Sequence, residues 1–153
     1  MEGTQRAIYP ILVCQFNYQG HSDDAPHWAL VVLISRHVAY IYEVLGGVDN
    51  FFFQRRRMET FVGSQTLRGG CKIGEIPADS LDFLEQKLRE TPVIRQDPQW
   101  TSKTWVVHAI RHLQEYKIVF SHVNERHVRD ELASDLKRWH ELEDTVVERT
   151  YPE

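Results

Sequence analysis

Two neighbouring apolar runs in the first third of the chain predict a buried β-hairpin. The runs cover residues 27–34 and 38–44, and the polar segment 35–37 between them has the composition of a turn. His27 opens the first run, and Glu43 stands near the end of the second. Because an ionisable side chain is costly to bury without a partner, we expect His27 and Glu43 to pair.

Other segments have the apolar composition or the turn boundaries of strands. They are residues 7–14, 51–56, 60–62 and 71–76. Pro10 predicts that the first of them is an edge strand or carries a bulge, since proline has no N–H for a sheet ladder. Gly69-Gly70 is expected to interrupt the chain before the last. The polar segment 17–26 is predicted to be a loop long enough to lie over a site.

After Pro77 the apolar residues recur at helical spacing instead. Three amphipathic helices are predicted, at about 80–90, 101–113 and 124–142. Strands followed by helices are typical of an α+β fold, in which helices pack on an antiparallel sheet. We therefore expect residues 1–153 to form one α+β domain with two to three helices on its sheet.

Composition narrows the function. The chain has 153 residues, 42% hydrophobic and 26% charged, with a net charge of −4, which gives no basic face for nucleic acid. The run Arg55-Arg56-Arg57 is interpreted as solvated.

Cys14 and Cys71 have no further ligand at metal-binding spacing, so no metal, cofactor or disulfide is expected. No segment resembles a signal peptide or a membrane span, which predicts a cytoplasmic protein; self-association is left open.

The histidines do not form a recognisable metal motif. His108 and His112 are four residues apart, but the zincin motif requires a glutamate directly after the first histidine, and here Ala109 follows it. We interpret both as helix-surface residues, and His122 and His127 in the same way.

Ser102 stands at the start of the second predicted helix. It shares a helical stripe with Val106 and Ala109, so its side chain is expected to point inward. The free amides and the dipole at a helix N-terminus favour negative charge there. Such a serine is either a nucleophile or a helix cap, and periodicity alone favours the cap.

Three short motifs stand out together: His27-Trp28-Ala29-Leu30 opens a predicted strand, Tyr42-Glu43-Val44 leads into Gly46, and Trp100-x-x-x-x-Trp105-Val106 enters a predicted helix. In these motifs the sequence resembles a family of small fungal domains, which are in turn similar to the permuted papain-like thiol enzymes that include lecithin-retinol acyltransferase. The resemblance spans roughly residues 8–118. It implies a permuted papain-like fold with a histidine base, an orienting polar residue and a cysteine nucleophile.

Carried over to this chain, the resemblance makes His27 the general base, Glu43 the orienting group and Ser102 the nucleophile position. It places the substrate against the following residues: Trp28, Trp100, Thr101, Lys103 and Trp105. The family's Asn, Cys and Gln positions are here Thr101, Ser102 and Lys103.

Three interpretations of this departure stay open: a Ser-His-Glu arrangement, a pocket retained after acyl chemistry was lost, and an engineered replacement of cysteine. Serine needs stronger general-base help than a thiolate, which favours the repurposed pocket.

Two classes of function follow. As an enzyme, the protein would act on a small organic substrate by acyl transfer or hydrolysis, or by acid–base isomerisation or cyclisation, in fungal secondary metabolism. As a catalytically inactive scaffold, it would present its sheet or its C-terminal helix to a protein partner. A perturbed His27 within hydrogen-bond reach of Glu43 or Ser102, at the floor of a pocket, would favour the enzyme. A collapsed pocket, in which aromatic side chains fill the space around His27, would favour the scaffold.

Overall fold

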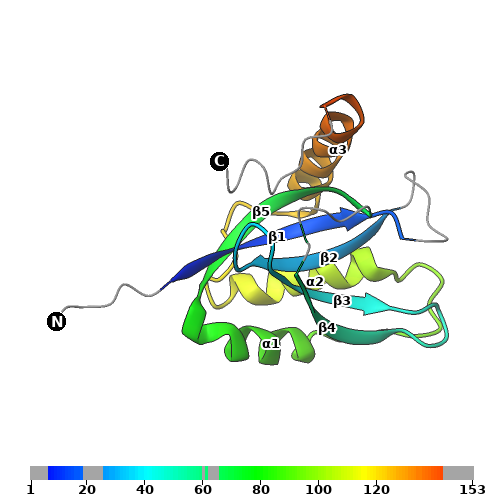
Figure 1. Ribbon diagram of the computed structural model, residues 1–153. Coiled ribbons are helices and arrows are strands. Elements are labelled where there is room, and N and C mark those ends of the chain that lie inside the picture. The colour runs from blue at the N-terminus through cyan, green and yellow to red at the C-terminus, as the bar shows by residue number, and fades with distance from the viewer. Residues whose placement is uncertain (1–6, 19–25, 60, 62–65, 143–153) are drawn as a thin grey trace.

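The computed structural model describes residues 7–18, 26–59, 61 and 66–142 (Figure 1). Five strands come first, and a 3-10 turn and three helices follow. The strands are β1 (Ile8–Phe16), β2 (His27–Leu33), β3 (Ala39–Leu45), β4 (Phe52–Met58) and β5 (Leu67–Pro77). The helical elements are η1 (Ala78–Ser80), α1 (Leu81–Glu90), α2 (Ser102–Gln114) and α3 (Glu125–Leu142).

The strands form one antiparallel sheet in the order β4-β3-β2-β1-β5. The predicted α+β class is therefore confirmed, and so is the hairpin of β2 and β3. In its turn the Ile34 amide donates to the Val38 carbonyl oxygen at 2.9 Å. Because β4 and β5 are the two edges, the chain between them crosses from one side of the sheet to the other. Phe61 lies on this crossing and donates its amide to the His37 carbonyl oxygen at 2.9 Å.

Side-chain alternation along the strands divides the core between the two faces of the sheet. One face carries the helix-side cluster, to which all three helices contribute. Its strand members are Ile11, Val13, Trp28, Leu30, Val32, Tyr42, Val44, Cys71, Ile73 and Ile76. The other face carries the far-side cluster of Leu12, Cys14, Phe16, Ala29, Val31, Leu33, Ala39, Ile41, Phe61 and Leu67.

The helices are held to the sheet by their apolar stripes. Helix α2 runs beneath β2 and β3 with α1 beside it, and α3 lies against β5 (Figure 1). Buried Trp105, Ile110 and Leu113 of α2 and Val128 and Leu132 of α3 fill the helix-side cluster. Burying a side chain of this size stabilises the fold by about 1.5–3 kcal/mol. Within the described ranges, no helix has the length and hydropathy needed to cross a bilayer.

Two local expectations change. Strand β1 is interior rather than an edge, but the alternative expectation of a bulge is confirmed, because its register with β5 shifts between Ile11 and Leu12. Pro10 is tolerated because the pairing of β1 with β2 ends at Ile11 and Val32, so that Pro10 pairs only with Glu75 of β5. Gly69-Gly70 does not interrupt the chain but lies inside β5. The strand expected at 60–62 and the loop expected at 17–26 fall largely outside the described residues; Phe61 itself is not in a strand.

Gly74 marks the place where a returning segment closes on β5. It forms a bridge with Val119, and next to it the Phe120 amide donates to the Ile73 carbonyl oxygen at 2.9 Å. A Cβ atom at position 74 would collide with the backbone carbonyl oxygen of Ile118 and would lie 3.0 Å from the Cα atom of Val119. The backbone itself is in the way, so a side chain cannot be accommodated by changing a rotamer.

We predict that Gly74→Ala lowers the free energy of unfolding by about 1–3 kcal/mol, the usual cost of overpacking. Gly47→Ala is the matched control, because the nearest atom to its Cβ would be Asn50 Oδ1 at 3.8 Å. Urea denaturation followed by circular dichroism measures both variants. Equal stabilities of the two variants would contradict the close approach at Gly74.

Candidate functional site

His27 is the first residue of β2, where its imidazole is almost completely buried, with 4% of its surface exposed. Alternation puts its side chain on the same face as Ala29 and Val31, away from the helices. The ring of Tyr18 lies against the imidazole, with 4.9 Å between centroids and 31° between planes. The ring orientation is thus restricted by packing as well as by polar contacts.

Glu43, on the neighbouring strand β3, is the partner expected from the sequence. Its carboxylate is fully buried, and its Oε1 lies 2.9 Å from His27 Nε2. The two side chains meet because Glu43 alternates with Tyr42 and Val44, which point toward the helices, and so faces the far side of the sheet with His27. The hairpin register alone is enough to bring the pair together.

Two further residues complete this network and were not identified from the sequence. Arg56 of β4 donates from Nε to Glu43 Oε2 at 2.8 Å, and the Tyr18 hydroxyl donates to Glu43 Oε1 at 3.0 Å. Arg56 Nη2 also donates to the Tyr18 hydroxyl oxygen at 2.6 Å. Both carboxylate oxygens therefore accept hydrogen bonds, and a guanidinium balances the buried charge.

The network fixes the protonation of Glu43. Burial alone would raise the pKa of the Glu43 carboxyl, but the hydrogen bonds from His27 and Arg56 outweigh it and leave that pKa below its usual value. Burial and the neighbouring Glu43 charge raise the pKa of Tyr18, which therefore stays a neutral donor. Since an ionised carboxylate only accepts, His27 Nε2 is the donor in its hydrogen bond with Glu43 Oε1.

A cavity of about 200 Å³ adjoins the network at the end of the sheet. Its lining comes from the segment after β1, from the start of β2, from the end of β3 and the segment after it, and from the start of α2. The residues are Tyr18, His27, Val44, Leu45, Gly46, Phe51, Thr101 and Ser102. His27 and Ser102 belong to opposite sides of the sheet, and this cavity at the strand ends is where they share a space.

Ser102 is not the cap of α2, contrary to what periodicity alone favoured. Thr101 is the N-cap: its hydroxyl oxygen accepts from the Lys103 amide at 3.2 Å, and its own amide donates to the Thr104 hydroxyl oxygen at 3.1 Å. The half-buried Ser102 side chain lines the cavity as the first residue of the helix. Ser102 thus borders the cavity at the N-terminus of the helix.

The five residues expected to contact a substrate are divided between the core and the surface. Trp28, Trp100 and Trp105 are buried in the helix-side cluster, and none of them is among the described residues that line the His27 cavity. Thr101 lines that cavity. Lys103 lies beside it in a hollow of about 240 Å³, where burial and the nearby Arg129 charge lower its pKa.

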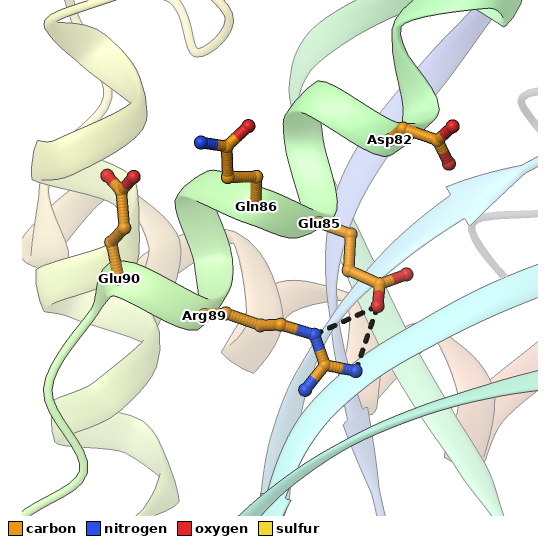
Figure 2. A pocket seen from close by; sticks show the side chains of 5 residues that line it. All are labelled: Asp82, Glu85, Gln86, Arg89 and Glu90. Carbon is orange, nitrogen blue, oxygen red and sulfur yellow. Dashed lines mark hydrogen bonds and ion pairs between the residues drawn. The ribbon is translucent and has the colours of Figure 1, made fainter.

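A larger hollow, of about 470 Å³, runs along α1 but has the character of open surface. Figure 2 shows that its lining side chains, from Asp82 to Glu90, all project from this one helix. Arg89 and Glu85 form an ion pair across it, with Nη2 and Oε2 separated by 2.8 Å. Charged groups paired along a single solvated helix do not converge on a ligand, so we assign no site here.

Comparison with protein-family models, with curated proteins and with solved structures gave no match for this chain. The case for a functional site therefore rests on the geometry of His27, Glu43 and the cavity.

The electrostatics of Glu43 predict a stability that depends on pH. The pKa of Glu43 is lower in the folded protein than in the unfolded chain. Ionised Glu43 therefore contributes fully to the free energy of unfolding above the ordinary pKa of glutamate, about 4.3, and this contribution is lost as pH falls through the pKa of the folded protein. At pH 7, Glu43→Gln should lower the free energy of unfolding by about 3 kcal/mol, because it leaves Arg56 without its carboxylate.

Urea denaturation of the wild type and of Glu43→Gln at several pH values checks this. The difference in free energy of unfolding between the two proteins should be constant from about pH 7 to 5 and should become smaller below about pH 4. Glu59→Gln removes the partner of the exposed Arg57, 3.3 Å away, and should change stability by less than about 1 kcal/mol. A difference in free energy of unfolding that stays constant down to pH 3 would contradict an ionised Glu43 paired with Arg56.

Proposed function

We propose that this protein is an enzyme that acts on a small organic substrate held in the His27 cavity, with His27 as its general acid–base group. The observation that carries the proposal is the buried His27–Glu43 pair, locked by Arg56 and Tyr18 beside an accessible volume. A histidine whose second nitrogen is held by a carboxylate is the usual arrangement of a catalytic base. A partly open cavity of about 200 Å³ suits a small molecule rather than a polymer.

Acyl transfer or hydrolysis is the first chemistry that this arrangement supports. Ser102 Oγ attacks the acyl carbon while the His27 imidazole accepts the hydroxyl proton, and Glu43 stabilises the imidazolium that results. The developing oxyanion lies near the N-terminal amides of α2. His27 then returns the proton to the leaving group, and water or a second substrate takes the acyl group from Ser102.

Proton transfer without a nucleophile is the second chemistry, and the strand geometry favours it. His27 projects from the face of the sheet opposite to α2, so it meets Ser102 only at the strand ends. In this mechanism His27 removes a proton from one carbon or heteroatom of the substrate and returns it at another, as in isomerisation or cyclisation. Ser102 then serves as a hydrogen-bond donor.

The fold assignment belongs to the same proposal. We propose that the sheet and α2 correspond to the permuted papain-like arrangement. The chain order of a strand-initial histidine, a polar residue on the next strand and a small polar residue at a helix start supports it. A fungal, cytoplasmic role in secondary metabolism rests on this resemblance alone.

Hydrolysis of 4-nitrophenyl acetate tests the proposal. His27→Ala should lower the rate at least about 100-fold, the usual contribution of a positioned acid–base group. His37→Ala is the matched control, since His37 is exposed at the hairpin turn, and its variant should keep the wild-type rate. Circular dichroism confirms that each variant is folded.

Ser102→Ala separates the two chemistries. A large loss of rate, together with His27-dependent labelling of Ser102 by a fluorophosphonate, establishes Ser102 as the nucleophile. A retained rate and no labelling establish proton transfer by His27. If neither substitution at His27 nor at Ser102 changes the rate, the enzyme proposal is wrong, and the inactive protein-binding scaffold takes its place.

A further inference from the structure

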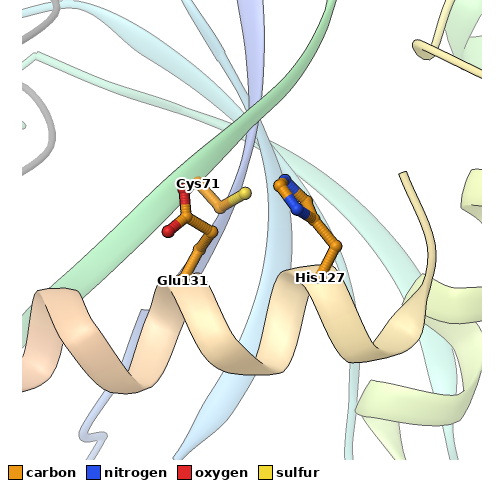
Figure 3. Close-up of side chains that lie close together, drawn as sticks. All are labelled: Cys71, His127 and Glu131. Carbon is orange, nitrogen blue, oxygen red and sulfur yellow. The ribbon is translucent and has the colours of Figure 1, made fainter. Parts of the chain in front are cut away.

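Three potential metal ligands from distant parts of the chain meet between β5 and α3. Cys71 lies on β5, and His127 and Glu131 lie one turn apart on α3 (Figure 3). One donor atom from each, a sulfur, an imidazole nitrogen and a carboxylate oxygen, lies within 4.8 Å of the others. The three side chains converge on the gap between the helix and the strand, as Figure 3 shows.

The packing of α3 fixes this juxtaposition. Val128 and Leu132, on the same side of the helix, are buried in the helix-side cluster. The Gln15 side chain donates from Nε2 to the Leu132 carbonyl oxygen at 2.6 Å, and the Gly70 amide donates to Asp135 Oδ2 at 2.8 Å. These bonds hold α3 to the ends of β1 and β5. The elements that carry the three residues are therefore held together by the fold.

Within the described residues, the three side chains have few other contacts. Within the described part of the chain, the Glu131 carboxylate and the His127 imidazole form no hydrogen bond or ion pair. The His127 ring packs edge to face against that of His122, with 5.4 Å between centroids. Among the described residues, the Cys71 sulfur has a weak contact to the Lys72 carbonyl oxygen, at 3.8 Å, and no other hydrogen bond. Three candidate ligands are thus present, and no described residue competes strongly for their donor atoms.

We propose that Cys71, His127 and Glu131 bind a zinc-class divalent cation that links α3 to β5. Thiolate, imidazole and carboxylate together select zinc and its neighbours over calcium or magnesium, which prefer oxygen ligands. With bonds of about 2.0–2.3 Å, tetrahedral donors stand roughly 3.3–3.8 Å apart, so closing the shell takes a shift of about 1 Å. Water completes it as the fourth ligand.

A bound cation would have to displace the proton of the Cys71 thiol. Burial raises the pKa of the Cys71 thiol to about 12, and the Glu131 and Asp135 charges add to the shift. Without a cation the thiol keeps its proton; on binding, the proton passes to solvent and the thiolate ligates the ion. Glu131 is exposed and His127 half-buried, which gives the ion a route from solvent. The site shares no residue with the His27 cavity.

Titration of the metal-free protein with Co²⁺ tests the proposal directly, because a thiolate ligand gives Co²⁺ an intense near-ultraviolet charge-transfer band. The wild type should develop this band to one equivalent, and Zn²⁺ should abolish it. Cys71→Ala should eliminate the band. Cys14→Ala is the matched control, a second buried free cysteine, and should retain it.

His127→Gln and Glu131→Gln should each weaken Co²⁺ binding by at least about 10-fold, since even outer-shell changes cost about 10- to 100-fold. His108→Gln changes an exposed histidine of α2 and should leave binding unchanged. These substitutions also decide the matter if Cys71→Ala fails to fold. The proposal would be overturned if the wild type develops no charge-transfer band. It would also be overturned if the Cys71→Ala variant still develops the band. The readout does not depend on ester hydrolysis, so it stands or falls separately from the enzyme proposal.

Discussion

The structure depends on the neutralisation of one fully buried carboxylate. Glu43 lies inside a sheet whose neighbouring side chains are apolar, where an uncompensated charge would cost several kcal/mol. Arg56 from β4, Tyr18 from the segment after β1 and His27 from β2 converge on it. Because each partner comes from a different element, the charge is balanced only when these strands are correctly paired and in register. The network thus makes register on this side of the sheet nearly obligatory.

The same constraint prepares His27 for chemistry. A carboxylate that Arg56 and Tyr18 hold from two sides cannot turn away, so it fixes both the tautomer and the plane of the imidazole. The entropy lost in orienting the imidazole is then lost during folding rather than when a substrate binds. The capping box of Thr101 has a parallel effect on α2, because it satisfies the helix end and leaves the neighbouring Ser102 side chain to line the cavity.

Local pattern in the sequence was sufficient for the hairpin, the three helices and the pairing of His27 with Glu43. Each of these follows from periodicity or from adjacent strands. Arg56 was hidden in a run of three arginines that looked solvated. Period-two alternation separates it from Arg55 and Arg57, which remain exposed on the edge strand. Tyr18 could not be found, because nothing local shows where a side chain beyond the end of β1 will lie. Thr101 displaced Ser102 as the cap because Thr104, three residues on, completes a capping box.

The cluster at Cys71 shows why ligand spacing along the chain is a weak test for metal sites. No histidine stands near Cys71 in sequence, and His127 taken alone is an ordinary helix residue. The two meet because α3 packs on β5, a long-range contact that no local pattern encodes. The charged groups around Cys71 differ from those around Glu43. Around Glu43 the fold supplies a guanidinium, whereas around Cys71 it gathers Glu131 and Asp135, whose charges oppose a thiolate. A cation from solvent would resolve that opposition, since it favours the thiolate and stabilises the carboxylates together.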